Sequence, residues 1–170
     1  MPLRITAMLA SVFLAAGALS ACGGDEKAGS KSQLTAKTGE TVPAGAKSGA
    51  LRLVDAAPVS YAKMKGSAML TRSESGTTMR VMISGLKPGT RLAGHVHQQR
   101  CAQEEGGDHY QFLRGGAKEP PNEIHVKLLA GAGGAATATT STPLIAGPAA
   151  MSVVVHDAIR GGKVACADVA

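Results

Sequence analysis

Short apolar runs separated by turn residues occupy the chain from Ala50 onward. They are too short for ordinary helices, and the chain shows no helical period, heptad or internal repeat. Polar and apolar positions alternate in Thr78-Met79-Arg80-Val81, and turns containing glycine or proline recur between the runs. The runs are residues 51–54, 68–70, 79–83, 124–129, 135–140 and 151–155. This pattern predicts an all-β domain, either a sandwich or a Greek-key barrel.

The N-terminal part of the chain lacks this pattern. Arg4 precedes a mostly apolar stretch, residues 7–19, which is typical of a signal peptide over residues 1–21. A transmembrane helix is the alternative, but at ~1.5 Å per residue the stretch spans about 20 Å, short of a ~30 Å hydrocarbon core. Residues 22–47 contain almost no large apolar side chain, which predicts a flexible linker before a domain over residues 48–170.

The sequence Leu19-Ser20-Ala21-Cys22 resembles the lipobox of bacterial lipoproteins. The resemblance implies that Cys22 is lipid-modified and anchors the mature protein to a membrane of the cell envelope, facing outside the cytoplasm. Cys101 and Cys166 then remain as a pair in an oxidising compartment. A disulfide between them is predicted, with two free thiols as the alternative.

The charge balance is mildly basic, with 18 Lys+Arg against 12 Asp+Glu and a net charge of +6. A nucleic-acid site is one explanation and a solvated cationic surface is the other. Export removes the usual nucleic acids, and aromatic residues make up only 2% of the chain, too few for a base-stacking platform. We therefore expect no nucleic-acid partner.

The chain has five histidines, and all of them fall in the β-rich part. His95 and His97 are two apart on an expected strand, so both imidazoles lie on one face. His156 ends the run 151–155, and His109 lies in a long segment, residues 98–121, of the kind that is often functional. If strands and loop meet, four imidazoles converge on a site suited to copper, zinc, iron or nickel.

The His-x-His pair also fits the start of the cupin metal motif. Five residues separate Gly89 from His95-Val96-His97, as that pattern requires. The motif then needs a glutamate four or five residues after His97, but Cys101 and Ala102 occupy those positions. The cupin interpretation is therefore disfavoured.

Several motifs between Lys65 and Val169 together resemble the copper-zinc superoxide dismutase family. They are Ser84-Gly85-Leu86-Lys87-Pro88-Gly89 with Gly94-His95-Val96-His97, then Gly106-Gly107-Asp108-His109-Tyr110, Ser152-Val153-Val154-Val155-His156 and Gly161-Gly162-Lys163-Val164-Ala165-Cys166. The resemblance implies a Greek-key barrel or sandwich of about eight strands. It also implies a Cys101–Cys166 disulfide.

The same resemblance implies that His95, His97, His109 and His156 bind copper, and that the enzyme converts superoxide into O₂ and H₂O₂. Lys163 stands where the family has an active-site arginine. Lysine keeps the positive charge that draws in the anion but lacks the planar fork that orients it. A copper-binding lipoprotein without enzymatic activity, on the same fold, is the alternative function, and a domain that has lost its metal is a third.

The chain departs from the family at the zinc site. After His109 the segment offers only His125, with Asp108 and Glu123 as nearby carboxylates, whereas a structural zinc site needs four ligands. The sequence thus predicts a copper protein without zinc. For His125 it favours an exposed strand residue, with a role in metal binding as the alternative. The oligomeric state is left open.

Overall fold

Nine strands and two short 3₁₀ turns make up the part of the protein that the computed structural model describes, residues 45–170. The strands are β1 (Ala46–Ala50), β2 (Arg52–Leu53), β3 (Lys65–Ser73), β4 (Gly76–Ser84), β5 (Arg91–His97), β6 (His125–Leu129), β7 (Ala136–Thr142), β8 (Ser152–Asp157) and β9 (Lys163–Asp168). The 3₁₀ turns are η1 (Val59–Tyr61) and η2 (Glu104–Gly106).

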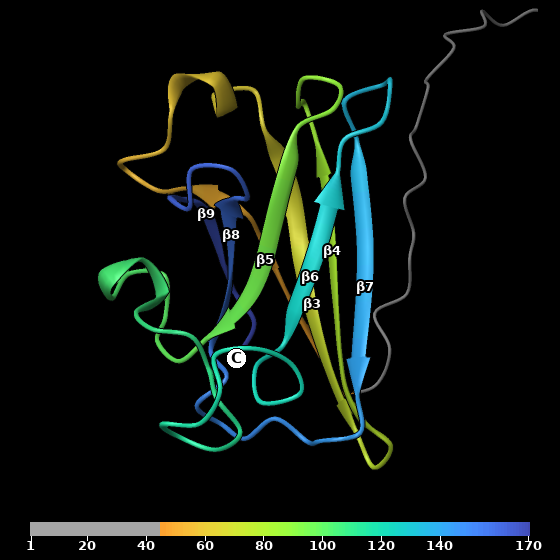
Figure 1. Ribbon diagram of the computed structural model, residues 1–170, viewed down its shortest axis with the longest axis vertical. Coiled ribbons are helices and arrows are strands. Elements are labelled where there is room, and N and C mark those ends of the chain that lie inside the picture. Colours follow the sequence, from red (N-terminus) through yellow and green to blue (C-terminus); the bar gives the residue numbers. More distant parts are fainter. Residues whose placement is uncertain (1–44) are drawn as a thin grey trace, which may run out of the picture. The chain divides into compact units, whose positions relative to one another are not determined.

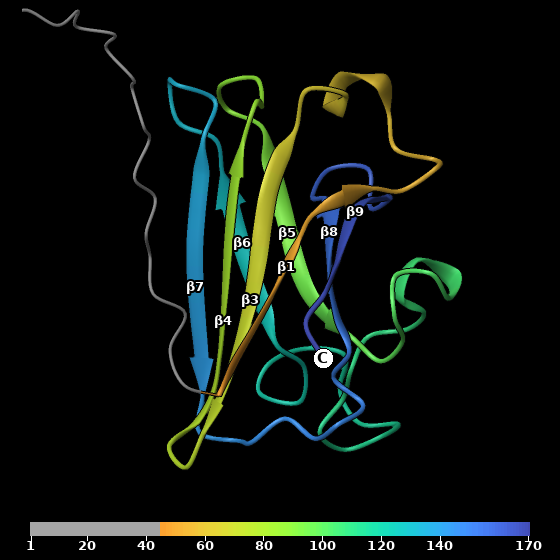
Figure 2. The same ribbon diagram turned by 180° about the vertical axis from the view of Figure 1, so that it is seen from behind.

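The strands form two antiparallel sheets that pack against each other (Figures 1 and 2). One has the order β1-β3-β4-β7 and the other the order β2-β9-β8-β5-β6. Strands distant in sequence are neighbours, as β4 with β7 and β5 with β8, because the chain crosses between the sheets in Greek-key fashion. Strands β6 and β7 lie next to each other without a hydrogen-bonded ladder between them. The all-β prediction is confirmed, and the open sandwich, not the closed barrel, is the form adopted.

The core lies between the two sheets and follows the alternation of the strands. Leu70, Met79 and Val81 from the four-stranded sheet are fully buried, as are Leu92 and Val96 from the five-stranded sheet. Each inward side chain contributes about 1.5–3 kcal/mol through burial of its apolar surface. The intervening residues of β5 therefore point to the outer face of the five-stranded sheet, where loops can cover them.

Strand β8 is buried on both of its faces. Val153 and Val155 point into the core, and Val154 points outward beneath a small cluster with Val54 and Cys166. A continuous apolar run is what such a doubly covered strand requires. The long segment after β5 thus packs on the outside of the sheet.

Most of the predicted runs lie in strands of the structure, namely β3, β4, β6, β7 and β8. The run 51–54 forms only the two-residue β2. Strand β1 has no apolar pattern, and it begins at Ala46, two residues before the expected start of the domain. The proposed signal peptide, Cys22 and nearly all of the linker lie outside the described residues. Residues 45–170 contain no helix with the length and hydrophobicity needed to cross a membrane.

Candidate metal centre

Strand β5 carries the His95-Val96-His97 motif with Val96 in the core. His95 and His97 therefore emerge on the outer face of the five-stranded sheet, as their spacing predicts. His97 is only 1% exposed, whereas His95 is half-buried. The strand thus aims two imidazoles at one region under the segment that follows.

The neighbouring strand β8 supplies His156 to the same face. In the antiparallel register, Val154 is opposite His95 and His156 is opposite Ala93. The pairing of β8 with β9 shifts between Val155 and His156. A bulge of this kind turns the side chain that follows it, and His156 faces His97 across the two strands.

The long segment brings His109 to the histidines by folding back along the end of β5. Three backbone hydrogen bonds fix this return, from Gln98 N to Asp108 O, from Gln99 N to Gly106 O and from Tyr110 N to Val96 O. Gly106 has a φ of 96°, and a Cβ atom there would lie 2.7 Å from Val154. Only glycine permits so close an approach with this backbone conformation.

A disulfide ties the start of this segment to β9. Cys101 and Cys166 are joined, with their Cα atoms 5.6 Å apart, so the predicted pairing is present in the structure. The backbone N–H of Cys101 donates to the Asp168 carboxylate, and the Ser152 hydroxyl donates to the carbonyl of Gln99. The loop that carries His109 is therefore fastened to the sheet at both β8 and β9.

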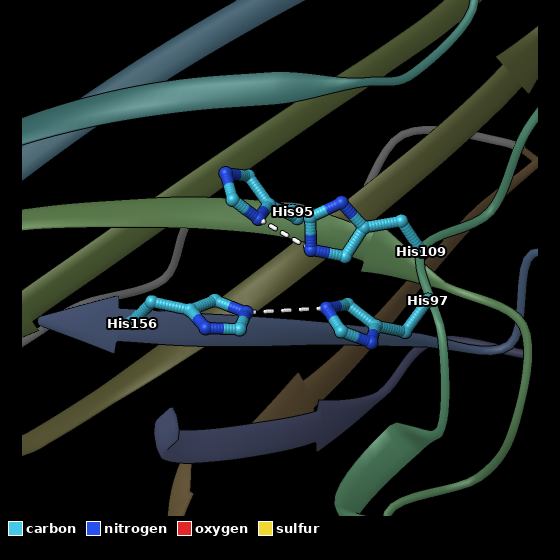
Figure 3. A group of neighbouring side chains, drawn as sticks. All are labelled: His95, His97, His109 and His156. Atoms are coloured by element: carbon cyan, nitrogen blue, oxygen red, sulfur yellow. Dashed lines mark hydrogen bonds between the residues drawn. The ribbon is translucent and has the colours of Figure 1, made fainter. Parts of the chain in front are cut away.

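Four histidine nitrogens converge in the resulting site, as Figure 3 shows. The candidate ligand atoms of His95, His97, His109 and His156 all lie within 4.8 Å of one another. His95 Nδ1 is 2.9 Å from His109 Nε2, and His97 Nε2 is 3.2 Å from His156 Nε2. Nitrogens about 2.0 Å from one metal ion lie about 2.8 Å apart at a right angle and about 3.3 Å apart in a tetrahedron. The spacing therefore fits neighbouring ligands of a single ion.

Three of these rings are oriented by contacts of Nδ1, the ring nitrogen that faces away from the centre. His97 Nδ1–H donates to the carbonyl of Gly107 at 2.9 Å, and His156 Nδ1 faces that of Gly161 at 3.4 Å. His109 Nδ1–H donates to Glu123 Oε2 at 2.6 Å. With the proton on Nδ1, the lone pair of a neutral ring is on Nε2, the atom that faces the centre.

The site favours neutral imidazoles. Burial, together with the neighbouring imidazoles, lowers the pKa of His95 from 6.5 to about 3. Burial also lowers the pKa of His97 to about 3, although the hydrogen bond to Gly107 opposes the shift. For His156 burial again lowers the pKa. Neutral rings are the form that binds metal ions.

A second group next to this site is built around the carboxylate of Glu123, whose side chain is 1% exposed. His109 and His125 both donate to Oε2, at 2.6 and 2.8 Å, and Gln111 donates to Oε1 at 2.9 Å. Burial raises the pKa of Glu123, but the donors outweigh it and lower the pKa to about 2. The short distances and the shared oxygen are those of charge-assisted hydrogen bonds. His125 is thus a member of this network, and the prediction of an exposed strand residue is wrong.

Lys163 lies at the edge of the site, at the start of β9. Its ammonium donates to the carbonyls of Glu104 at 2.7 Å and Gly107 at 3.2 Å. Two of its three N–H groups are therefore used, and the third remains for a ligand. Lys163, Arg114 and Lys118 line an open cavity of about 690 Å³, whose wall also includes His97 and His156. Neither Arg114 nor Lys118 has an ion pair within residues 45–170.

The structure brings together every histidine predicted as a ligand. The supporting role of Glu123, Gln111 and His125 was not predicted from the sequence. Glu123 and His125 are two residues apart at the start of an expected strand, the same spacing as His95 and His97. That pattern was the available signal, but the pairing of β5 with β6, which sets His125 opposite His95, could not be derived from it.

Comparison with known proteins supports the fold. No protein-family model and no curated protein matches the chain. Among solved structures, a Cu/Zn superoxide dismutase from Brucella abortus is 20% identical, with a TM-score of 0.48, over 73% of this chain and 100% of that one. The clock protein EA4 is 18% identical, with a TM-score of 0.53, over 77% of this chain and 96% of that one. The second similarity shows a shared fold; neither identity carries function.

Proposed function

We propose that this protein is a copper-dependent superoxide dismutase of the cell envelope. The observation that carries the proposal is the convergence of four histidine nitrogens within 4.8 Å on the outer face of the five-stranded sheet. The residues meet in the combination and order of the copper-zinc superoxide dismutase motifs that the sequence resembles. The proposed ligands are His95, His97, His109 and His156.

The donor set supports copper as the metal. A set of only imidazole nitrogens, with carboxylates held in hydrogen bonds outside it, favours copper over magnesium, calcium or manganese. The backing hydrogen bonds of His97 and His109 fix which nitrogen faces the ion. When bound, copper would supply the one-electron chemistry that oxidises one superoxide to O₂ and, with two protons from solvent, reduces another to H₂O₂.

The residues around the site attract and admit the anion. Lys163 holds a positive charge at the rim, with one N–H free for superoxide after its two carbonyl contacts. Arg114 and Lys118 add to the field of the same cavity. Like charges gathered around an open cleft raise the local concentration of an oppositely charged substrate.

Export and membrane anchoring are part of the proposal. The apolar stretch before Cys22 and the lipobox-like ending support a lipid-anchored form, and they lie outside the described residues. The Cys101–Cys166 disulfide supports the same location, because disulfides persist in oxidising compartments outside the cytoplasm. Zinc is not part of the proposed centre.

The test compares superoxide consumption by the copper-loaded protein, the metal-free protein and the same amount of free copper. The proposal predicts that only the copper-loaded protein exceeds free copper. The alternative is a copper-binding protein without activity, favoured by Lys163 in place of the family's arginine. Copper bound at one equivalent with no activity above free copper would establish that alternative and reject the dismutase.

A further inference from the structure

The fifth histidine, His125, is outside the proposed ligand set but lies directly against it. It is the cross-strand partner of His95, and the two ring centroids are 4.2 Å apart. Its side chain is 24% exposed, whereas Lys127, two residues further along the same face of β6, is an exposed residue. His125 is therefore half-buried against the ring of His95, while Lys127 beyond it is exposed.

The contact that distinguishes His125 is its hydrogen bond to Glu123. Its Nε2–H donates to Oε2, the same oxygen that accepts from His109. A carboxylate that is 1% exposed depends on such donors, because an ionised group that loses a partner in the interior is strongly destabilised. Removing the donor on His125 leaves Gln111 on the other oxygen and His109 alone on this one.

We propose that His125 is a positioning residue, which holds Glu123 so that Glu123 fixes the ring of His109. The inference rests on the proposed copper site. Glu123 accepts the hydrogen bond from Nδ1–H of His109. A shift of Glu123 would therefore also move Nε2 of His109, the nitrogen that faces the centre. Partners behind a ligand commonly change metal affinity by about 10- to 100-fold when they are removed.

The test uses the full chain with three substitutions. His125→Gln keeps an N–H donor at a similar distance along the side chain, and His125→Leu removes it. Lys127→Leu is the matched control, since it puts the same apolar side chain on the same face of β6, away from the site. Copper affinity is measured by competition with a chelator, and the copper environment by electron paramagnetic resonance.

We expect His125→Leu to bind copper about 10-fold more weakly, with an altered spectrum, and His125→Gln and Lys127→Leu to resemble the unsubstituted protein. Unchanged affinity and spectrum in His125→Leu would overturn the inference, even if the variant is less stable. If His125→Leu does not fold, His125→Asn replaces it, because its shorter amide fails to reach Glu123. His125→Asn matching His125→Gln would then contradict the proposal.

A second readout needs no copper. Imidazole ¹⁵N resonances of the metal-free protein report which nitrogen of His109 carries the proton. The inference predicts a proton fixed on Nδ1 in the unsubstituted protein and in His125→Gln, and a mixture of tautomers in His125→Leu. A protein that binds no copper refutes the proposed function, whereas an unchanged His109 tautomer in His125→Leu refutes the role of His125.

Discussion

At the scale of single residues, Lys163 separates an enzyme from a carrier. Its ammonium is held by the carbonyls of Glu104 and Gly107 at the edge of the cavity. Lys163→Glu should slow superoxide turnover far more than it weakens copper binding, because it reverses the field that attracts the anion. Lys163→Arg should preserve or raise the rate, because the guanidinium fork can orient an anion.

Rates at increasing salt concentration check this prediction. The rate of the unsubstituted protein should fall as salt screens the field, over a Debye length of ~8 Å at physiological ionic strength. The slope should be shallower or inverted in Lys163→Glu. Lys87→Glu is the control, since Lys87 does not line this cavity. Equal rates for all variants at equal copper content would reject a role for Lys163.

Tyr61 next to the turn after His156 gives a prediction on stability. Its side chain is 5% exposed and its hydroxyl donates to the Asp157 carboxylate at 2.9 Å. Burial, and then the hydrogen bond to Asp157, raise the pKa of Tyr61 from 10.0 to about 12. Folding therefore favours the neutral phenol. The resulting stability is present below pH 10 and is lost as the pH rises through 12.

Urea unfolding of the unsubstituted protein and Tyr61→Phe between pH 7 and pH 11 checks this. At pH 7 the substitution should cost on the order of 2 kcal/mol, the range for a hydrogen bond to a charged group. The difference in the free energy of unfolding between the two proteins should shrink above pH 10, where Tyr61 ionises in the unfolded chain but stays neutral in the folded protein. A difference that stays constant over this range would show that folding does not raise the pKa of Tyr61.

At the scale of elements, the disulfide links the segment after β5 to β9. Replacing Cys101 and Cys166 together by serine should lower the free energy of unfolding by about 4 kcal/mol, because a loop of 65 residues is no longer closed. Copper affinity should also fall, since the loop that carries His109 loses one fastening. Chemical denaturation and a copper titration of the double variant measure the two effects. Unchanged copper affinity would mean that the backbone return at residues 106–110 is sufficient to hold His109.

The pattern of apolar residues predicted some strands and missed others. The apolar residues of β4 and β8 made those strands visible, because each strand buries large side chains on one or both faces. Strand β1 has the sequence AKSGA. Strand β9 buries four consecutive residues, two of them alanines, so neither strand shows a strong alternating pattern. Their formation depends on pairing with β3 and β8, which is tertiary information.

The sequence was sufficient to predict which histidines form the site, but not how they are arranged in space. The i, i+2 spacing was sufficient to direct His95 and His97 to one face. The position of His109 depends on a loop that returns along β5, with glycines where side chains would collide, and no periodic pattern encodes that return. The buried network of Glu123 likewise depends on β6 pairing with β5, which explains why His125 was misinterpreted.

At the scale of the whole molecule, the core and the candidate metal site lie on opposite faces of the five-stranded sheet. The inner faces of the two sheets form the apolar core, whereas the outer face of the five-stranded sheet carries the histidines under a loop fastened by a disulfide. Lipid modification of Cys22 and attachment to the envelope remain predictions from the sequence. They concern residues outside the described domain and are independent of the site.

A copper titration of the mature protein beside its His97→Ala variant tests the proposed metal centre most directly. His97 is the most buried of the four histidines, and its Nε2 is 3.2 Å from that of His156. Metal content after removal of excess copper is measured for both, with Lys127→Ala as the control. We expect one copper per chain in the unsubstituted and control proteins, and a loss of tight binding in His97→Ala. Undiminished copper binding by His97→Ala would contradict the proposed metal centre.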